Sequence, residues 1–519
     1  MDKLEGFKVL MAFIPIIWLL VSLAKIKMMA YRASAIALIV TAVIAVMLFA
    51  MPVTLAAQAA LEGFMLALFP IIWVIVSALF VYNITLSTGS LEIIKKMLSA
   101  VSADRRIQAL ILAFAFGGFL EAVAGFGTAV AIPAGILIAM GFSPYMAATV
   151  CLIANTIPVA FGVLGVPVVT LAQVTALPLD KLSLYTAVQL IPFVIVLPFV
   201  LIYAVTGSFK NIKGVVGVSL FSGFLFALGQ TITAMAVGPE LAAVVGSLAA
   251  LAGIILWIKI FPIRNTWLFE GEGSTDFRTE KIGFGAALKA WAPYALILLL
   301  VFATRFIPFL DFLNQYPFVL KQQFYFGPGG KALTFPLATS GGTILFVSAI
   351  LGGFIQGFGP VKIAETLKTT IIQVKKTLIT ILAIVALAKI MTYSGMVNSV
   401  AAAFAAVSGS FYPLIAPMIG ALGTFVTGSD TSSNVLFGNL QKQTAIQLNI
   451  SQEWLAAANA SGATAGKMIS PQSISIAATS TGLTNSEGKM LSYTLKYCII
   501  YVILMGILVF ISQGIVNFL

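Results

Sequence analysis

Two stretches of this 519-residue chain share one pattern: NTIPVAFGVLGVP at residues 155–167 and NASGATAGKMISP at residues 459–471. Each is an Asn-x6-Gly-x4-Pro block, in which glycine and proline interrupt an apolar segment. A further glycine precedes each block at a matching distance, given one inserted residue: Gly125 in the first copy and Gly428 in the second. Duplicated, interrupted apolar segments at corresponding places in two halves of a chain are typical of the central site of a membrane transporter.

The composition requires a lipid environment. Hydrophobic residues make up 60% of the chain and charged residues 9%, and the mean hydropathy is +1.08. Too few polar side chains remain to cover such a protein in water. Apolar runs long enough to cross a bilayer recur from end to end, so we expect an all-α polytopic membrane protein with about 12 to 14 transmembrane segments.

The sequence lacks the groups that several other classes of protein need. Cys151 and Cys498 lie in apolar runs and have neither metal-ligand spacing nor a disulfide pattern. The net charge of +12 comes from basic residues in short loops, as membrane topology requires, so no nucleic-acid partner is expected. Because there is no histidine, no phosphate-binding loop and no Ser/His/Asp set, we expect no ATP motor, enzyme activity, metal or cofactor.

The positions of lysine and arginine predict the orientation of the spans. Basic clusters follow the first apolar run, at residues 25–32, and the third, at 95–106, so both loops should lie in the cytoplasm and the N-terminus outside. The polar segment 265–283 is then a cytoplasmic linker between two halves, residues 1–264 and 284–519. Lysines precede the last span and none follows it, so the C-terminus should also lie outside.

The two halves are expected to be inverted repeats. The span that ends near Thr88 carries its lysines after it, whereas the aligned span that ends near Ser394 carries them before it, at residues 368–376. The spans should therefore cross in opposite directions, with broken or re-entrant helices of both halves meeting near the middle of the membrane. Residues 309–340, rich in Pro, Gly and aromatic side chains, should form an external lid or interfacial segment.

Ionisable side chains at membrane depth cost about 2.5 to 3.5 kcal/mol each on insertion scales, so those that occur there are functional candidates. We find Glu121, Asp430, Lys389 and Lys467 in such positions. Lys467 could bind a substrate carboxylate or serve as the counter-ion of Asp430. Lys389 aligns with Asn83 of the other half and is a secondary candidate, because its long stem could instead reach the outer interface.

The polar run GSDTSSN at residues 428–434 lies between two apolar segments and predicts a broken helix. Such a break exposes backbone N–H groups at the start of a half-helix, where hydroxyl groups can complete an anion site. The alternative is that Ser429 or Asp430 only caps the helix. The run is longer than a cap needs, so we expect it to bind substrate through Asp430, Thr431, Ser432 and Ser433.

Small polar residues recur at a second pair of matching positions. Asn155 and Thr156 occupy the first, and Asn459, followed by Ser461, occupies the second. We predict a helix break at each place, with amide and hydroxyl groups offered to a ligand near the axis between the halves. The alternative is that each asparagine caps its own broken helix. The expected substrate site therefore adds Asn155, Thr156, Asn459, Ser461 and Lys467, with Gln472 and Ser473 as secondary candidates.

A co-transported proton would have to travel on a carboxyl group, because the chain has no histidine. Glu121 follows Phe119 and Leu120, and apolar surroundings favour the neutral form of a carboxyl group, so Glu121 is the expected proton carrier. Asp430 is the second candidate, since neighbouring hydroxyl groups and Lys467 should hold it ionised. The alternative is that Glu121 only forms a hydrogen bond or an ion pair with a neighbouring helix.

Four blocks of the sequence, residues 119–133, 151–167, 427–441 and 456–477, resemble the lactate permease family of bacterial transporters. The resemblance implies proton-coupled uptake of L-lactate and related 2-hydroxymonocarboxylates, such as glycolate, across the bacterial plasma membrane. It also implies kinship with the ion transporter superfamily, whose members pair re-entrant hairpins in an elevator-like mechanism and suggest a homodimer by analogy. A sodium-coupled carboxylate transporter of the same superfamily is the alternative.

Overall fold

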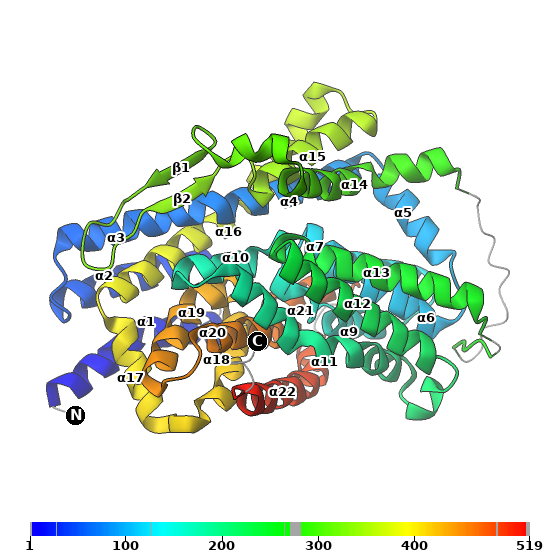
Figure 1. Cartoon of the computed structure of the whole chain (residues 1–519). Helices are drawn as coiled ribbons and strands as arrows, with labels where there is room; N and C mark the ends of the chain where they lie inside the picture. The colour runs from blue at the N-terminus through cyan, green and yellow to red at the C-terminus, as the bar shows by residue number, and fades with distance from the viewer. Residues whose placement is uncertain are drawn as a thin grey trace.

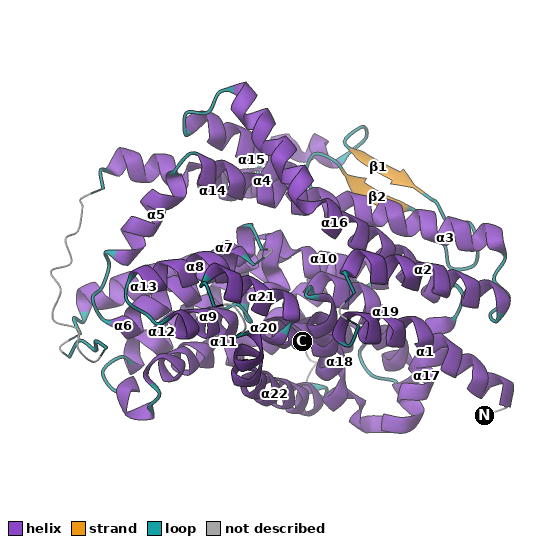
Figure 2. Ribbon diagram, turned by 180° about the vertical axis from the view of Figure 1, so that it is seen from behind, coloured by secondary structure: helices purple, strands orange, loops and turns teal. Residues whose placement is uncertain are grey.

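The computed structural model is a two-layered bundle of helices (Figures 1 and 2), and it describes residues 3–26, 28–125, 127–263, 265–269, 282–483 and 486–514. Within these residues, 12 helical segments are long and apolar enough to cross a membrane, and three shorter apolar helices accompany them. The expected all-α polytopic membrane fold is therefore confirmed. The predicted linker at residues 265–283 lies largely outside the described residues.

The first layer lies across the top of Figure 1 and is organised around α16, a helix of 34 residues. One side of α16 packs against α2, α3 and α4, while α15 packs between α4 and α14. The first layer comprises α2 (Ala30–Met47), α3 (Val53–Leu66), η1 (Ala67–Ile72), α4 (Trp73–Ser87), α5 (Ser90–Ser99), α14 (Phe284–Phe306), α15 (Gly341–Ile355) and α16 (Pro360–Tyr393).

The second layer contains most of the buried polar residues and both copies of the repeated block. Its centre is formed by α18, α19 and α20, which pack on one another, with α10 against α19 and α13. The second layer comprises α6 (Arg105–Ala109), η2 (Leu110–Phe116), α7 (Gly117–Val123), α8 (Thr128–Ala139), α9 (Pro144–Ala154), η3 (Pro158–Phe161), α10 (Gly162–Thr175), α11 (Leu179–Thr206), η4 (Phe209–Ile212), α12 (Val216–Ala236), α13 (Pro239–Ile260), α18 (Tyr412–Thr427), α19 (Asp430–Leu448), α20 (Gln452–Ile469), α21 (Pro471–Ser480) and α22 (Glu487–Ser512).

Two further helices join the layers, and a small hairpin covers part of the first. Helix α1 packs against α2 of the first layer and against α17, which packs on α19. The hairpin is antiparallel, with Val319 opposite Pro336 and Gln322 opposite Leu333. These remaining elements are α1 (Lys3–Ala24), η5 (Pro308–Asn314), β1 (Val319–Gln322), β2 (Leu333–Pro336), α17 (Met396–Ser408) and η6 (Gly409–Phe411).

The paired helices α3 and α4 run antiparallel to α16. Glu62 of α3 pairs with Lys389 near the end of α16, with 2.9 Å between Oε1 and Nζ. Asn83, near the end of α4, donates hydrogen bonds to Thr370 and Gln373 in the first half of α16. The next helices accordingly lie at opposite ends of Figure 1, α5 on the right and α17 on the left. The two spans that the sequence aligns thus run in opposite directions.

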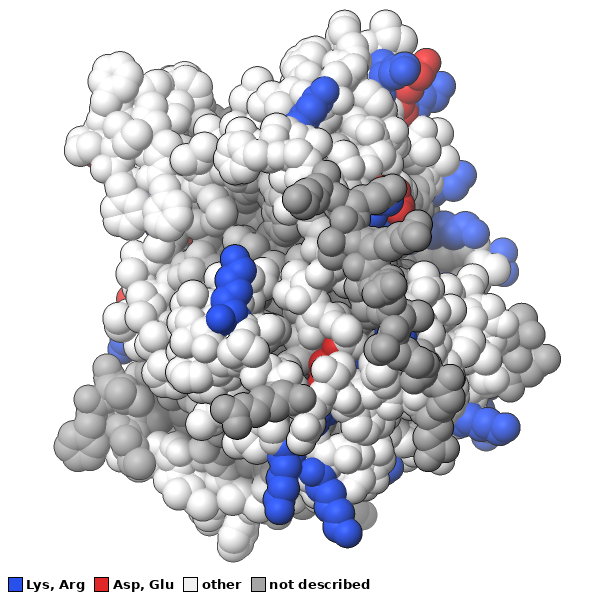
Figure 3. Space-filling view, turned by 90° about the vertical axis from the view of Figure 1, so that its right-hand side faces the viewer, with Lys and Arg blue, Asp and Glu red and all other residues white. Residues whose placement is uncertain are grey.

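Charged side chains are sparse on the surface. Figure 3 views the molecule from the right-hand side of Figure 1, where α5 and α6 lie. Most of that face is uncharged, and Lys and Arg side chains are more visible on it than Asp and Glu. Helix α5 brings Lys95 and Lys96 to this end, whereas the N-terminal helix α1 begins at the opposite end.

Candidate functional site

The polar run at residues 428–434 does break a helix, between α18 and α19. Gly428 has a φ of +73°, which glycine adopts without strain, and α19 begins at Asp430. Ser429 is the N-cap, and its hydroxyl oxygen accepts a hydrogen bond from the Ser432 N–H at 3.3 Å. Asp430 is 2% exposed, and neither of its carboxylate oxygens has a hydrogen-bond partner among the described residues. The capping hypothesis therefore holds for Ser429 and not for Asp430.

The corresponding break in the first half separates α7 from α8 and places a buried carboxyl group beside it. Gly125 and Gly127 have φ values of +58° and +87° at this break, and Glu121 lies in the preceding α7 with 4% of its surface exposed. A Cβ added to Gly162 would lie 3.3 Å from Glu121 Oε1, whereas Oε2 of Glu121 has no hydrogen-bond partner among the described residues. The glycine of the first repeated block therefore makes room for the carboxyl group of Glu121.

The break predicted at Asn155 is confirmed. Helix α9 ends at Ala154, and Asn155 and Thr156 follow in a turn, where both are buried. No hydrogen-bond partner is present, in the described part of the chain, for either side chain. Asn155 lies beside Glu121, and the chain then takes three consecutive positive φ values at residues 163–165 before α10 becomes regular.

The second repeated block breaks at a different place. Helix α20 is continuous over Gln452–Ile469, so the break predicted at Asn459 is wrong. The chain breaks instead at Ser470, the N-cap of α21. The alignment of the two prolines is nevertheless meaningful, because Pro167 lies in the first regular turn of α10 and Pro471 is the first residue of α21. Each proline thus stands where a half-helix starts, a position that tolerates its missing N–H group.

The starts of α10, α19 and α21 border one cavity of 890 Å³, which we call the inner cavity. Helix N-termini carry unpaired N–H groups and partial positive charge, so they favour anions. The predicted site residues that line the inner cavity are Glu121, Asp430, Thr431, Ser432, Lys467 and Gln472. The structure thus brings these six side chains together around one space.

Lys467 supplies the buried positive charge of the inner cavity. It is 9% exposed, and its Nζ donates a hydrogen bond to Gly428 O, 2.9 Å away, at the C-terminal end of α18. A cation is favourable there because of the helix dipole. The charge of Lys467 also acts on both Glu121 and Asp430. The ammonium group donates to the backbone, and the Asp430 carboxylate has no hydrogen-bond partner within the described residues, so Lys467 acts on Asp430 through its charge and not through a hydrogen bond.

Asn459 and Ser461 do not line the inner cavity but join the helices around it. Asn459 Nδ2 donates to Asn434 Oδ1 at 2.9 Å, and Asn434 Nδ2 donates to Pro167 O at 3.0 Å, which connects α20, α19 and α10. Ser461 Oγ donates to Gln189 Oε1 of α11 at 2.5 Å. The hydrogen-bonding groups of these side chains are used within the protein, so they position the site without facing a substrate.

Two other predicted serines are also used internally. Ser433 Oγ donates to Gly420 O of α18 at 2.8 Å. Ser473 lies in the first turn of α21, where its Oγ accepts from Ser470 Oγ at 2.8 Å. Neither serine lines the inner cavity. The difference follows from helix periodicity: Thr431 and Ser432 face the cavity, and the next residue of α19 points toward α18.

Lys389 lies in a second cavity, of 1160 Å³, which we call the outer cavity. Its partner there, Glu62, is 1% exposed and was not among the predicted site residues. Glu62 stands inside the apolar segment 53–87, so the cost of an ionisable group at membrane depth would have identified it. Lys389 is 8% exposed and pairs with Glu62 inside the protein.

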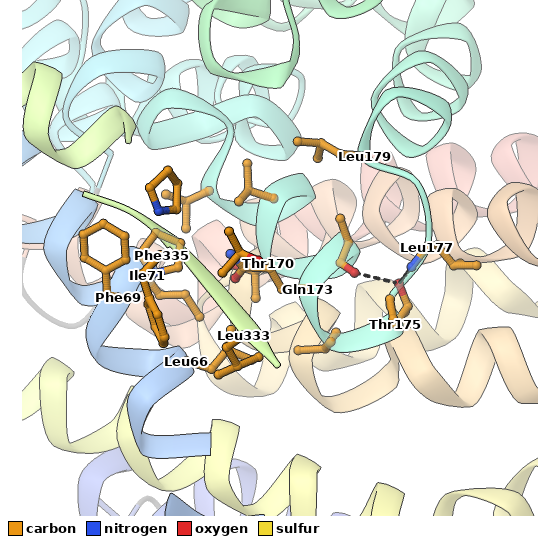
Figure 4. A pocket seen from close by; sticks show the side chains of 18 of the residues that line it. Leu66, Phe69, Ile71, Thr170, Gln173, Thr175, Leu177, Leu179, Leu333 and Phe335 are labelled. Carbon is orange, nitrogen blue, oxygen red and sulfur yellow. Dashed lines mark hydrogen bonds between the residues drawn. The ribbon is translucent and has the colours of Figure 1, made fainter. Parts of the chain in front are cut away.

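The outer cavity is enclosed by the hairpin and by the second half of α10. Figure 4 shows Leu66 and Phe69, from α3 and η1, near Phe335 of β2, with Thr170 and Gln173 of α10 on the far side. The hairpin, which belongs to the predicted external segment 309–340, therefore forms one wall. Only a thin partition separates the two cavities, since α10 contributes Val166 to both.

Comparison with known proteins identifies the family. The family described as L-lactate permease matches residues 8–516. An L-lactate permease of Streptococcus iniae is 42% identical over 87% of this chain and 94% of its own length. The glycolate permease GlcA of Escherichia coli (strain K12) is 36% identical over 97% of this chain and 95% of its own length. An L-lactate permease of Bacillus subtilis (strain 168) is 34% identical, with coverages of 98% and 96%.

These relatives are named as permeases, and the chain is accordingly a multi-pass membrane transporter and not an enzyme. The resemblance of the four sequence blocks agrees with a match that extends over nearly the whole length. The chain belongs to the L-lactate permease family.

Proposed function

We propose that the chain is a symporter that takes up lactate and related 2-hydroxymonocarboxylates, such as glycolate, together with a proton across the bacterial plasma membrane. Relatives named as lactate and glycolate permeases support this substrate class. The observation that carries the proposal is the inner cavity, where Lys467 and the starts of three half-helices lie beside two carboxyl groups with unpartnered oxygens. A cation and helix N-termini suit a carboxylate ligand, and a protonatable group beside them suits coupling.

The substrate carboxylate is placed at the start of α19. Thr431 and Ser432 offer hydroxyl groups there, and Lys467 offers the N–H donors that Gly428 does not use. Gln472 lines the same cavity and can exchange a hydrogen bond with the 2-hydroxyl group. The other polar residues predicted for this site do not line the cavity and support the arrangement from behind its wall: Asn155, Thr156, Ser433, Asn459, Ser461 and Ser473.

Coupling follows from the charges of the inner cavity. Among the buried side chains that line the cavity, Lys467 is a cation, and Glu121 and Asp430 carry carboxyl groups, whereas Lys376 and Glu487 of the same lining are exposed. A third negative charge in a space of low dielectric constant is strongly unfavourable. If Glu121 takes up a proton, the substrate anion replaces the lost negative charge, and the loaded site carries the same net charge as the empty one. Proton and anion therefore bind together, with Glu121 as the carrier and Asp430 as the second candidate.

We also propose that residues 1–264 and 284–519 are inverted repeats with both termini outside. The antiparallel pairing of α3 and α4 with α16 supports inversion. The inner cavity is lined by Tyr31 and Lys376, from predicted cytoplasmic segments, and the outer cavity by Asp311, from the predicted external segment. Cysteines introduced beside Lys95 and at Asn398 should react with an impermeant maleimide from opposite sides of the membrane. Reaction from the same side would contradict the inversion.

Uptake into proteoliposomes tests the proposed function. An inward proton gradient without sodium should drive accumulation of lactate and glycolate, and an uncoupler should abolish it. An inward sodium gradient at equal pH on both sides should drive none. If a sodium gradient alone drives accumulation, the coupling ion is sodium and not the proton. If neither lactate nor glycolate is accumulated, the proposed substrate class is contradicted.

A further inference from the structure

The ion pair between Glu62 and Lys389 lines the outer cavity, where a purely structural ion pair is not expected. Glu62 and Lys389 join α3 to α16 at membrane depth, and both side chains line the cavity. Buried ion pairs contribute little net stability, because desolvation offsets the attraction between the charges. An ionisable pair inside a membrane protein therefore indicates a functional role.

The pair also has hydrogen-bonding capacity that the protein does not use. Glu62 Oε1 accepts from Tyr393 OH at 2.7 Å and lies 2.9 Å from Lys389 Nζ. Glu62 Oε2 is buried and has no hydrogen-bond partner among the described residues. An ammonium group has three donors, and the described contacts of Lys389 are the one to Glu62 and a position 5.7 Å above the Tyr393 ring. Donors of Lys389 thus remain for a ligand in the cavity.

The hairpin segment closes over this pair. Tyr325 stacks on Tyr393, with 3.7 Å between ring centroids and 9° between ring planes. The neighbouring Phe326 N–H donates to Gln58 Oε1 of α3 at 3.0 Å. Among the described residues, the charged or titratable groups that face Glu62 are Lys389 and Tyr393 of α16 and Tyr325 of the hairpin segment.

We propose that Lys389 forms a second carboxylate-binding site, in the outer cavity, from which an arriving monocarboxylate displaces Glu62. The inference rests on the proposed function, because the ligand is taken to be the transported anion. Its carboxylate accepts hydrogen bonds from Lys389 Nζ in place of Glu62 Oε1. The outer site lies across the α10 partition from the inner cavity, so it collects the anion before the partition moves.

Glu62 keeps a hydrogen-bond partner after the exchange. Tyr393 can keep its hydrogen bond to Glu62 when the ligand is bound, since its hydroxyl group donates to a carboxyl oxygen.

The outer site can be tested separately from transport. Asn439 lines the outer cavity and donates to Thr392 Oγ1 at 2.9 Å, one helical turn from Lys389. The full-length Asn439→Cys protein in detergent should react with a maleimide through the outer cavity, while the native Cys151 and Cys498 are buried and line neither cavity. Lactate should slow this reaction, and the half-protecting concentration measures occupancy of the outer cavity. Protection should persist in the Lys467→Met background, which disables the inner cavity.

Substitutions of the pair decide the inference. Lys389→Met should raise the half-protecting concentration about tenfold or more, as expected for loss of a charged hydrogen bond. Lys389→Arg should leave the half-protecting concentration nearly unchanged. The control variant Lys331→Met, which removes another cation of the same cavity, should also leave this concentration nearly unchanged. Glu62→Gln should lower the half-protecting concentration, because the neutral amide no longer competes with the ligand for the Lys389 ammonium group. The double variant Glu62→Gln/Lys389→Met, which leaves no unpaired charge, should fold and show no protection.

Equal protection in the parent and Lys389→Met proteins would overturn the inference, as would weaker protection in a folded Glu62→Gln protein. If proteoliposomes take up lactate but lactate does not slow the maleimide reaction of the Asn439→Cys protein, the outer site alone is contradicted. If lactate slows that reaction but proteoliposomes take up none, the proposed function alone is contradicted.

Discussion

The inner and outer cavities hold the same kinds of charged groups but satisfy them differently. In the outer cavity, Glu62 and Lys389 form an ion pair at 2.9 Å. In the inner cavity, Lys467 donates to a backbone carbonyl, and oxygens of Glu121 and Asp430 have no partners among the described residues. Unpartnered buried carboxyl groups are costly. Glu62 Oε2 of the outer cavity is unpartnered too, so the two cavities differ in the partner of the cation, which is a carboxylate in the outer cavity and a backbone carbonyl in the inner one. Under the proposed function, a proton and a substrate anion complete the charges of the inner cavity.

Removal of the inner cation should have the largest effect. Lys467→Met leaves the two buried carboxyl groups without a buried cation, so lactate uptake should fall about a hundredfold through loss of a charged hydrogen bond. Lys442→Met is the matched control, because Lys442 Nζ also donates to a backbone carbonyl, Thr175 O, at 2.6 Å. Uptake of radiolabelled lactate should separate the two variants. Equal losses would show that Lys467 acts only through its carbonyl contact.

The repeat-related glycines should respond differently to alanine. In Gly162→Ala the new Cβ crowds Glu121 Oε1 at 3.3 Å, so uptake driven by a proton gradient should fall about tenfold while the protein stays folded. In Gly466→Ala the new Cβ meets the backbone oxygen of Ala421, so the folded protein itself should be lost. Thermal melting in detergent and uptake assays check both results. A destabilised Gly162→Ala protein with normal coupling would contradict the role given to Gly162.

Neighbouring serines of α19 should show the smallest difference. Ser432→Ala removes a hydroxyl group from the inner cavity and should weaken lactate binding about fivefold, the value of an ordinary hydrogen bond. Ser433→Ala removes the bond to Gly420 O and should lower the melting temperature without changing affinity. Equilibrium binding and melting curves distinguish the two. If Ser432→Ala only reduces stability, the polar run serves the helix and not the ligand.

Features that depend on local chain chemistry could be predicted from the sequence. Gly125 and Gly428 stand at real interruptions because glycine adopts positive φ without strain, and Asn155 does so because a short polar residue can end a helix. Asn459 could not be read in the same way. Whether an asparagine ends a helix or bonds to another helix depends on its spatial neighbour, and here Asn434 supplies that partner.

Charged groups at membrane depth were predictable as candidates but not as pairs. Lys389 was recognised, yet Glu62 is distant in sequence and meets it only through the antiparallel packing of α3 on α16. The placement of Lys467 on Gly428 O likewise depends on how α20 packs against α18. Composition and spacing therefore located Lys389 and Lys467 but not Glu62, and the tertiary structure decided which of these charges are paired.

The central claim is that a proton on Glu121 and the substrate anion bind the inner cavity together. Glu121→Gln keeps the neutral form permanently and tests this claim most directly, with Asp430→Asn as the matched variant. Proteoliposomes with Glu121→Gln should exchange internal for external lactate at a rate near that of the parent protein, because exchange requires no deprotonation. The same vesicles should not accumulate lactate under an inward proton gradient. Accumulation with normal pH dependence would contradict the claim and transfer the proton to Asp430.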